Sequence, residues 1–150
     1  MDFSDVPIRA PGTVDPSWWN SLRTAGLRLQ SMLGLGTGAI GETAFTFANT
    51  QGAAADVTAL LFSSAVCKSA YVWICARRKT DSASAYSEVE LWLSYDAANS
   101  TWLLQDEVEH GGPSGLTFTV TSAGQVKYTS DTVSGSNYSG ASKFKALTTV

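Results

Sequence analysis

The segment Lys68–Lys79 reads KSAYVWICARRK and carries the strongest strand signal of the 150-residue sequence. Side chains alternate between the two faces of a strand, and here both faces are apolar: Tyr71, Trp73 and Cys75 on one, Val72, Ile74 and Ala76 on the other. An apolar set on each face is typical of a central strand between two layers. The pattern therefore predicts that this strand lies in the middle of a sheet and that Trp73 belongs to the core.

Shorter segments with similar alternation lie on both sides of this strand. They are Glu42–Phe47, Asp56–Phe62, Tyr86–Tyr95, Thr101–Val108, Leu116–Thr121, Gln125–Ser130 and Ser142–Val150. Turn-forming residues separate them, and Ser122-Ala-Gly124 predicts a tight hairpin loop with glycine in the left-handed conformation. Seven or eight short strands divided by turns predict a mainly β fold, namely an antiparallel β-sandwich or jelly-roll-like domain.

The alternation also predicts which side chains fill the core, because every second residue of a strand faces the same side. The expected inward set is Val89, Leu91, Leu93, Tyr95, Leu116, Phe118, Val120, Val126, Tyr128, Phe144 and Ala146. Phe45 and Phe47 share one face of their strand, and Thr101–Val108 carries Trp102 and Leu104. Glu88 and Glu90 fall on the opposite, outward face.

A different pattern precedes the strands. Asp15 and Pro16 suit the start of a helix, and Gly34 suits its C-cap. Spacings of four and three residues give that helix one apolar stripe, made of Trp18, Leu22, Ala25, Leu29 and Met32. The sequence thus predicts an extended N-terminal arm and one α-helix over 1–33, a glycine-rich hinge over 34–41 and a β-sandwich domain over 42–150.

The predicted helix is a candidate attachment element. Its stripe follows coiled-coil spacing for about two heptads, which is too short to hold an oligomer by itself. Two interpretations stay open: packing on the β-domain of the same chain, or docking against another protein or between copies around a symmetry axis. In the second, the anchor residues are Trp18, Trp19, Leu22, Leu29 and Met32.

Composition excludes two classes of partner. The net charge is −3 with a pI near 5.0, whereas a protein that reads a nucleic-acid backbone needs a basic stripe. The sequence also contains no apolar run of membrane-spanning length and no secretory leader pattern. We therefore expect neither nucleic-acid binding nor membrane insertion, and we expect synthesis in a reducing cytoplasm.

The two cysteines fit that compartment. Cys67 and Cys75 are eight residues apart, and an extended chain would separate them by roughly 26 Å, far beyond the reach of a disulfide. A bridge would need Cys67 to lie in a turn that folds back. We expect two free, buried thiols.

Catalytic groups are sparse. His110 is the only histidine and lies in a glycine- and proline-rich turn, where a solvated role is more common than a catalytic one. Ser114 or Cys67 would be its nominal partner in a dyad, but no nucleophile-elbow pattern supports this. Gly36–Gly41 matches G-x-G-x-x-G, yet it follows a helix and precedes a strand, the reverse of the dinucleotide-binding context. We expect no enzyme activity and no cofactor.

Two groups of carboxylates are candidate sites. The cluster Asp106, Glu107, Glu109 and His110 offers calcium ligands but lacks the ladder of an EF-hand, so a solvated strand end is the favoured interpretation. Glu88 and Glu90 share a strand face, as an acid–base pair would, but solvated side chains or contacts to a neighbouring subunit are favoured there as well.

Trp92 shares the outward face of Glu88 and Glu90. Exposed aromatic rings stack on sugar rings, so Trp92 is a candidate glycan contact, although a core or subunit contact is favoured. The loop Ser134–Gly140, with Tyr138, is the second candidate surface.

The chain resembles small structural proteins of tailed bacteriophages, including tail-fibre-like and head-decorating proteins. The resemblance rests on VDPSWWNSLRTAG (14–26), ETAFTFAN (42–49), GLTFTVTSAGQVKYTS (115–130) and KFKA (143–146). It implies a non-enzymatic virion component, commonly trimeric, whose N-terminal part attaches to capsid or tail proteins and whose β-domain faces outward. Shaft repeats are lacking, which favours a decoration protein, a head fibre or a small tail-associated subunit over a complete receptor-binding fibre. A carbohydrate- or receptor-binding module is the alternative.

Overall fold

The computed structural model describes residues 21, 24, 25 and 38–150. The chain divides into two units, Met1–Gly34 and Leu35–Val150, and every strand of the described residues belongs to the second. Of the predicted N-terminal helix, Ser21, Thr24 and Ala25 are described, and all three are helical and exposed. The anchor residues Trp18, Trp19, Leu22, Leu29 and Met32 lie outside the described residues.

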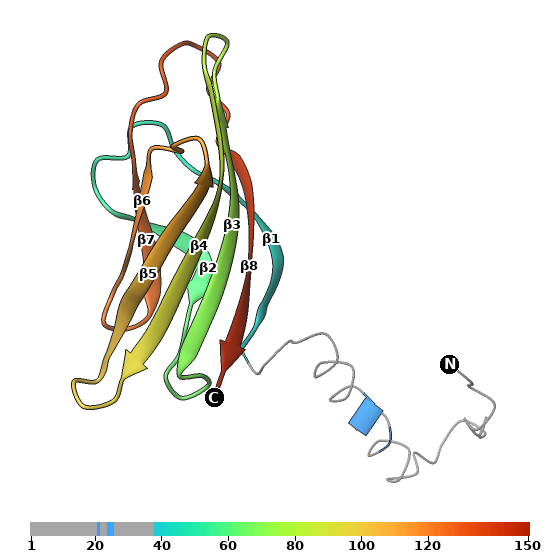
Figure 1. Ribbon diagram of the computed structural model, residues 1–150, viewed down its shortest axis with the longest axis vertical. Coiled ribbons are helices and arrows are strands. Elements are labelled where there is room, and N and C mark those ends of the chain that lie inside the picture. Colours follow the sequence, from blue (N-terminus) through green and yellow to red (C-terminus); the bar gives the residue numbers. More distant parts are fainter. Residues whose placement is uncertain (1–20, 22–23, 26–37) are drawn as a thin grey trace, which may run out of the picture. The chain divides into compact units, whose positions relative to one another are not determined.

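The second unit is an antiparallel β-sandwich of eight strands (Figure 1). The strands are β1 (Ile40–Thr46), β2 (Ala55–Leu61), β3 (Ser69–Lys79), β4 (Ser84–Asp96), β5 (Thr101–Gly111), β6 (Leu116–Val120), β7 (Gln125–Ser130) and β8 (Ala141–Thr149). One sheet has the order β1-β8-β3-β4-β5 and the other β2-β7-β6. The pairings β1–β8 and β2–β7 give the domain its jelly-roll-like character, while β3, β4 and β5 form a meander. The predicted fold class is confirmed.

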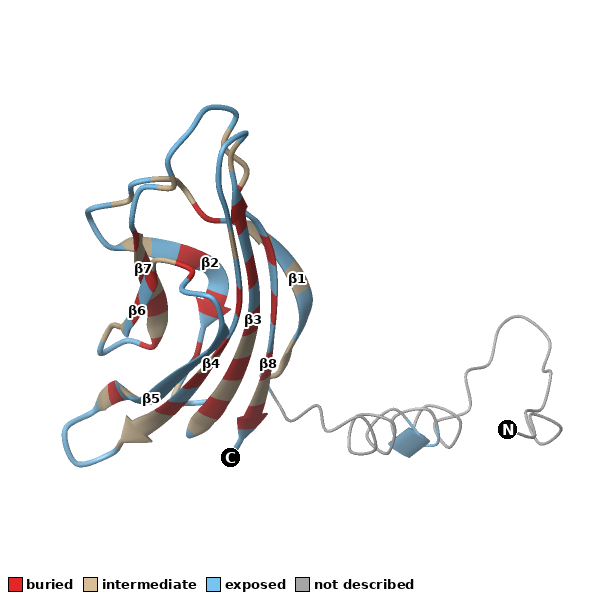
Figure 2. Ribbon diagram, turned by 45° about the horizontal axis from the view of Figure 1, so that its top comes forward, coloured by how far each residue is buried: buried red, intermediate tan, exposed pale blue. Residues whose placement is uncertain are grey.

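The core lies between the two sheets. The inner faces of β3, β4 and β8 supply Val72, Ile74, Val89, Leu91, Leu93, Phe144 and Ala146, all buried. Phe118, Val126 and Tyr128 come from the smaller sheet, and Figure 2 shows the resulting alternation of buried and exposed bands along β3, β4 and β8. Edge-to-face rings join the sheets, with centroids 5.9 Å apart for Phe47 and Phe118 and 4.8 Å apart for Phe47 and Tyr128.

Strand bounds differ from the predicted ones by a few residues. β1 begins at Ile40, so its first two residues lie in the stretch predicted as a hinge, and β5 continues to Gly111, into the glycine- and proline-rich turn predicted around His110. The division into 1–33, 34–41 and 42–150 otherwise stays a prediction. Among the described residues, no helix has the length and hydrophobicity needed to cross a membrane.

One prediction about β3 is wrong. β3 is central in its sheet, as expected, but only the side carrying Val72 and Ile74 packs on the second sheet. Trp73 therefore lies on the outer face and is only half-buried, not in the core. The second apolar set of this strand is on the solvent side of the described domain.

Candidate functional site

Three aromatic side chains form a ridge on the outer face of the five-stranded sheet. Tyr71 and Trp73 come from β3, and Trp92 of β4 lies directly opposite Tyr71 in the strand register. The ring centroids of Tyr71 and Trp73 are 4.3 Å apart at 71°, and those of Tyr71 and Trp92 are 6.2 Å apart at 79°. These are edge-to-face contacts, so the rings fix one another. Trp92 is nevertheless 55% exposed. We refer to Tyr71, Trp73 and Trp92 as the aromatic ridge.

An acidic flank borders the ridge on the side of β4 and β5. It consists of Glu88 and Glu90 of β4 and Asp106 of β5, which pairs with Trp92. The Tyr71 hydroxyl donates a hydrogen bond to Glu90 Oε2, and this bond raises the pKa of Tyr71. His110 Nε2 lies 3.8 Å from Glu90 Oε1. In the part of the chain that the structure describes, no lysine or arginine forms an ion pair with these three carboxylates.

A basic flank borders the ridge on the side of β8. It consists of Lys143 and Lys145, which pair with Cys75 and Trp73 of β3. Lys145 Nζ lies 5.1 Å from the centroid of the Trp73 ring, a cation–π contact. Lys143 Nζ donates to Glu42 Oε1 of β1 at 2.6 Å, and this hydrogen bond lowers the pKa of Glu42 and raises that of Lys143.

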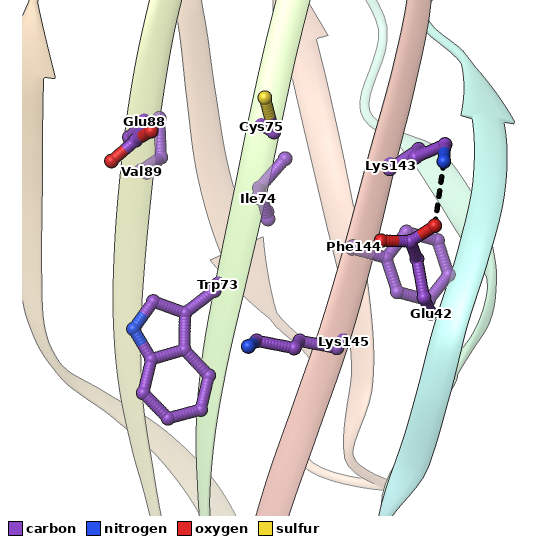
Figure 3. A pocket seen from close by; sticks show the side chains of 9 residues that line it. All are labelled: Glu42, Trp73, Ile74, Cys75, Glu88, Val89, Lys143, Phe144 and Lys145. Atoms are coloured by element: carbon purple, nitrogen blue, oxygen red, sulfur yellow. Dashed lines mark hydrogen bonds and ion pairs between the residues drawn. The ribbon is translucent and has the colours of Figure 1, made fainter.

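A shallow pocket of about 250 Å³ lies between the ridge and the basic flank (Figure 3). Trp73, Cys75 and Glu88 line it from β3 and β4, and Lys143, Lys145 and Glu42 line it from β8 and β1. Its lining combines the aromatic side chains of Trp73 and Phe144 with both signs of charge. Such a surface suits a polar partner that also has an apolar face.

Cys75 corrects a prediction. Cys67 and Cys75 are both free, but only Cys67 is buried, whereas Cys75 is exposed on the outer face. The expectation of two buried thiols is wrong because Cys67 precedes β3 in a turn, while Cys75 shares the uncovered face of Trp73. The Tyr86 hydroxyl lies 3.3 Å from Cys75 Sγ, and this hydrogen bond raises the pKa of Tyr86 to about 12.

The candidate catalytic residues do not converge on one site. His110 is exposed on β5 next to Glu90. Ser114 is buried, and its hydroxyl accepts a hydrogen bond from the Leu116 N–H at 3.2 Å, while Cys67 Sγ is 3.8 Å from the carbonyl oxygen of Ser63. The three groups of the nominal dyads are thus in separate local structures.

The acidic cluster at the end of β5 is divided between two faces. Asp106 and His110 pair with Trp92 and Glu88 of the outer face, whereas Glu107 and Glu109 pair with the inward-facing Leu91 and Val89. Strand alternation therefore separates the carboxylates at i and i+3. Within residues 21, 24, 25 and 38–150 there is no group of three side chains arranged to hold a metal ion.

Tyr138 of the Ser134–Gly140 loop is engaged inside the domain. Its hydroxyl donates to the carbonyl oxygen of Phe47 at 2.9 Å and accepts from Arg78 Nε at 3.1 Å. These bonds fix the loop, so its ring is held in place by the fold. Its role in surface binding stays a prediction.

Arg78 was not singled out from the sequence. It continues the inward row of Val72, Ile74 and Ala76 and is only 1% exposed. Its guanidinium donates to the carbonyl oxygens of Ser114 (2.5 Å), Gly115 (3.2 Å) and Asp131, and to Asn49 Oδ1 (3.2 Å). The sequence does contain a signal for this burial. Arg77 and Arg78 are adjacent on one strand, so their side chains point to opposite faces and one of them must face the core.

Comparison with known proteins adds one distant likeness. No family model matches the sequence, and no curated protein matches it. Among solved structures, the chain is similar to the tailspike protein of Acinetobacter phage vB_ApiP_P1, with 10% identity and a TM-score of 0.43. The match covers 99% of this chain and 24% of that chain, so this chain spans about a quarter of the length of the tailspike protein.

Proposed function

We propose that this chain is a non-enzymatic structural protein of a tailed-phage virion. In this role, residues 1–33 attach the protein to capsid or tail proteins, and the β-sandwich assembles with copies of itself, as a trimer, and projects from the particle. The protein serves as a capsid decoration, a head fibre or a tail-fibre-associated subunit, and it assembles in the host cytoplasm. The resemblance of 14–26, 42–49, 115–130 and 143–146 to such proteins supports this assignment.

One structural observation carries the proposal. The domain already encloses a core between its two sheets, yet the larger sheet exposes the aromatic ridge, including the 55% exposed Trp92, on its other face. An exposed aromatic patch with a charged rim is typical of an interaction surface. The catalytic candidates, in contrast, do not converge on any shared site, as His110 and Ser114 illustrate.

Deletion of residues 1–33 tests the attachment role. We expect the remaining β-domain to fold, with the circular dichroism of a β-protein, and to be lost from purified particles. A substitution outside the segment, such as Lys127→Gln on the smaller sheet, serves as the control and should leave incorporation unchanged. Normal incorporation of the truncated protein would contradict the attachment role.

A glycan-binding module is the second candidate, favoured by the exposure of Trp92 beside the carboxylates of Asp106, its partner in the register, and Glu90, two residues earlier on β4. Ring stacking on Trp92 with hydroxyl groups bonded to the carboxylates would hold a host-surface saccharide. On a glycan array, this function predicts binding by the wild type that Trp92→Ala abolishes, whereas a purely structural protein shows no Trp92-dependent signal.

A further inference from the structure

The outer face of the five-stranded sheet has the size of a protein interface. Five strands at a spacing of about 4.8 Å span roughly 19 Å, and the 11 residues of β3 at about 3.3 Å span roughly 36 Å. The product, roughly 700 Å², is close to the ~800 Å² that each partner contributes to a standard interface. Val108 adds exposed apolar surface near Trp92, and Tyr86 adds more of it further along β4 on the same face.

Most charge on this face is segregated by sign; the exceptions include Glu42 of β1, which is paired with Lys143, and Arg77 of β3. The acidic flank of Glu88, Glu90 and Asp106 lies on one side of the aromatic ridge, and the basic flank of Lys143 and Lys145 lies on the other. The ammonium of Lys145 contacts the Trp73 ring and forms no ion pair among the described residues. On the basic flank, Lys143 is already paired with Glu42, so Lys145 carries the charge available for a partner, while no lysine or arginine pairs with the carboxylates of the acidic flank among the described residues.

This layout is complementary to itself in one orientation. When copies of the face meet around an axis parallel to the strands, rotation places the acidic flank of one copy against the basic flank of the next, with the ridges meeting between them. A two-fold axis across the strands would instead set acidic against acidic and basic against basic, which like-charge repulsion disfavours. The distribution of charge thus favours a second copy of the chain as the partner and a rotation axis that is parallel to the strands.

We propose that this face binds further copies of the chain around an axis along β3, acidic flank to basic flank. The inference deepens the proposed virion role and rests on its self-assembly, not on attachment through residues 1–33. Assembly buries the ridge and pairs Glu88 and Asp106 with the partner's lysines of the basic flank.

Charge reversal in the full-length chain tests the proposal. One variant carries Glu88→Lys with Asp106→Lys and leaves Glu90, the hydrogen-bond acceptor of Tyr71, intact. The other carries Lys143→Glu with Lys145→Glu. Sedimentation equilibrium should show an oligomer for the wild type and dissociation constants about tenfold or more higher for each variant alone. An equimolar mixture of the two variants should form mixed pairs, because the flanks of one variant are basic and those of the other are acidic. A closed trimer is not expected from the mixture, since three contacts cannot all join an acidic subunit to a basic one.

The control is the swap Asp56→Lys with Lys127→Glu on the smaller sheet, where the two side chains form an ion pair at 2.7 Å. It preserves the pair and the net charge and should associate like the wild type.

A wild type that stays monomeric, variants that associate normally, or a mixture that fails to assemble would each overturn the proposal. A monomeric wild type would leave the attachment role of residues 1–33 intact, since particle incorporation tests that separately. Circular dichroism and thermal unfolding confirm folding of each variant, and increasing salt should weaken wild-type association as a second measurement.

Discussion

Arg78 is a cation buried in the β-sandwich without a carboxylate partner in the described contacts. Burial of an unpaired charge costs several kcal/mol unless hydrogen bonds replace its water. Here the acceptors are mainly backbone carbonyls from the segments around Ser114 and Asp131, with the side chains of Asn49 and Tyr138. One side chain therefore holds three loops together at one end of the sandwich.

Replacing Arg78 with methionine should destabilise the domain by about 2–4 kcal/mol, because the carbonyl acceptors stay buried without a donor. Urea unfolding followed by tryptophan fluorescence measures the change. Arg77→Met is the matched control, because Arg77 is exposed on the outer face. This substitution should change the free energy of unfolding by less than about 0.5 kcal/mol. Equal effects of the two substitutions would show that the buried network contributes little.

At the scale of elements, the β6–β7 hairpin depends on Gly124. This residue has φ +91°, and its carbonyl accepts a hydrogen bond from the N–H of Phe62 at 3.1 Å. A Cβ atom added there would lie 2.1 Å from the Phe62 carbonyl oxygen and 2.9 Å from the Trp102 ring. The hairpin loop thus reaches the ends of β2 and β5 only because position 124 has no side chain.

Gly124→Ala should therefore cost about 2 kcal/mol or more, from backbone strain and from displacement of the contacts to Phe62 and Trp102. Thermal unfolding by calorimetry measures the loss. Gly112→Ala is the control, because nothing lies within 4 Å of its added Cβ and its φ is not in the left-handed region. A Tm for Gly124→Ala within error of the control would contradict the close approach.

Alternation in the sequence was sufficient for most elements and for the core. The strand around Val89, Leu91 and Leu93 and the glycine at 124 are as predicted, because local chemistry alone determines a pleated strand with one buried face and a left-handed turn. The predicted burial of Trp73 and Cys75 is wrong for a physical reason. An apolar strand face has the same pattern whether a second sheet or another protein covers it.

The site itself was only partly predictable. The shared outward face of Trp92, Glu88 and Glu90 follows from their spacing of two residues. The basic flank does not, since Lys143 and Lys145 are about seventy residues from Trp73 in the sequence and become its neighbours only through the β3–β8 pairing. Strand order is a long-range property that periodicity does not encode.

For the whole molecule, the position of each strand in its sheet predicts its resistance to hydrogen exchange. Amides of β3 bond to β4 and β8 on its two sides, whereas β1 is an edge strand with a register irregularity between Ile40 and Thr43. Exchange measured by mass spectrometry should be about 100-fold or more slower in β3 than in β1. Equal protection of β1 and β3 in the monomeric protein would contradict this strand order.

The place of β8 between β1 and β3 also has a consequence for biosynthesis. Ala141–Thr149 is the last strand in the chain, yet it joins the first strand to the middle of the larger sheet, and Lys143 pairs with a residue 101 positions earlier. While a ribosome makes this domain, β1 has no neighbour in its own sheet and β3 has one open edge until β8 emerges. Such long-range closure is slow and leaves unpaired edges exposed. The nascent domain is therefore most in need of chaperone protection before Ala141–Thr149 has been made.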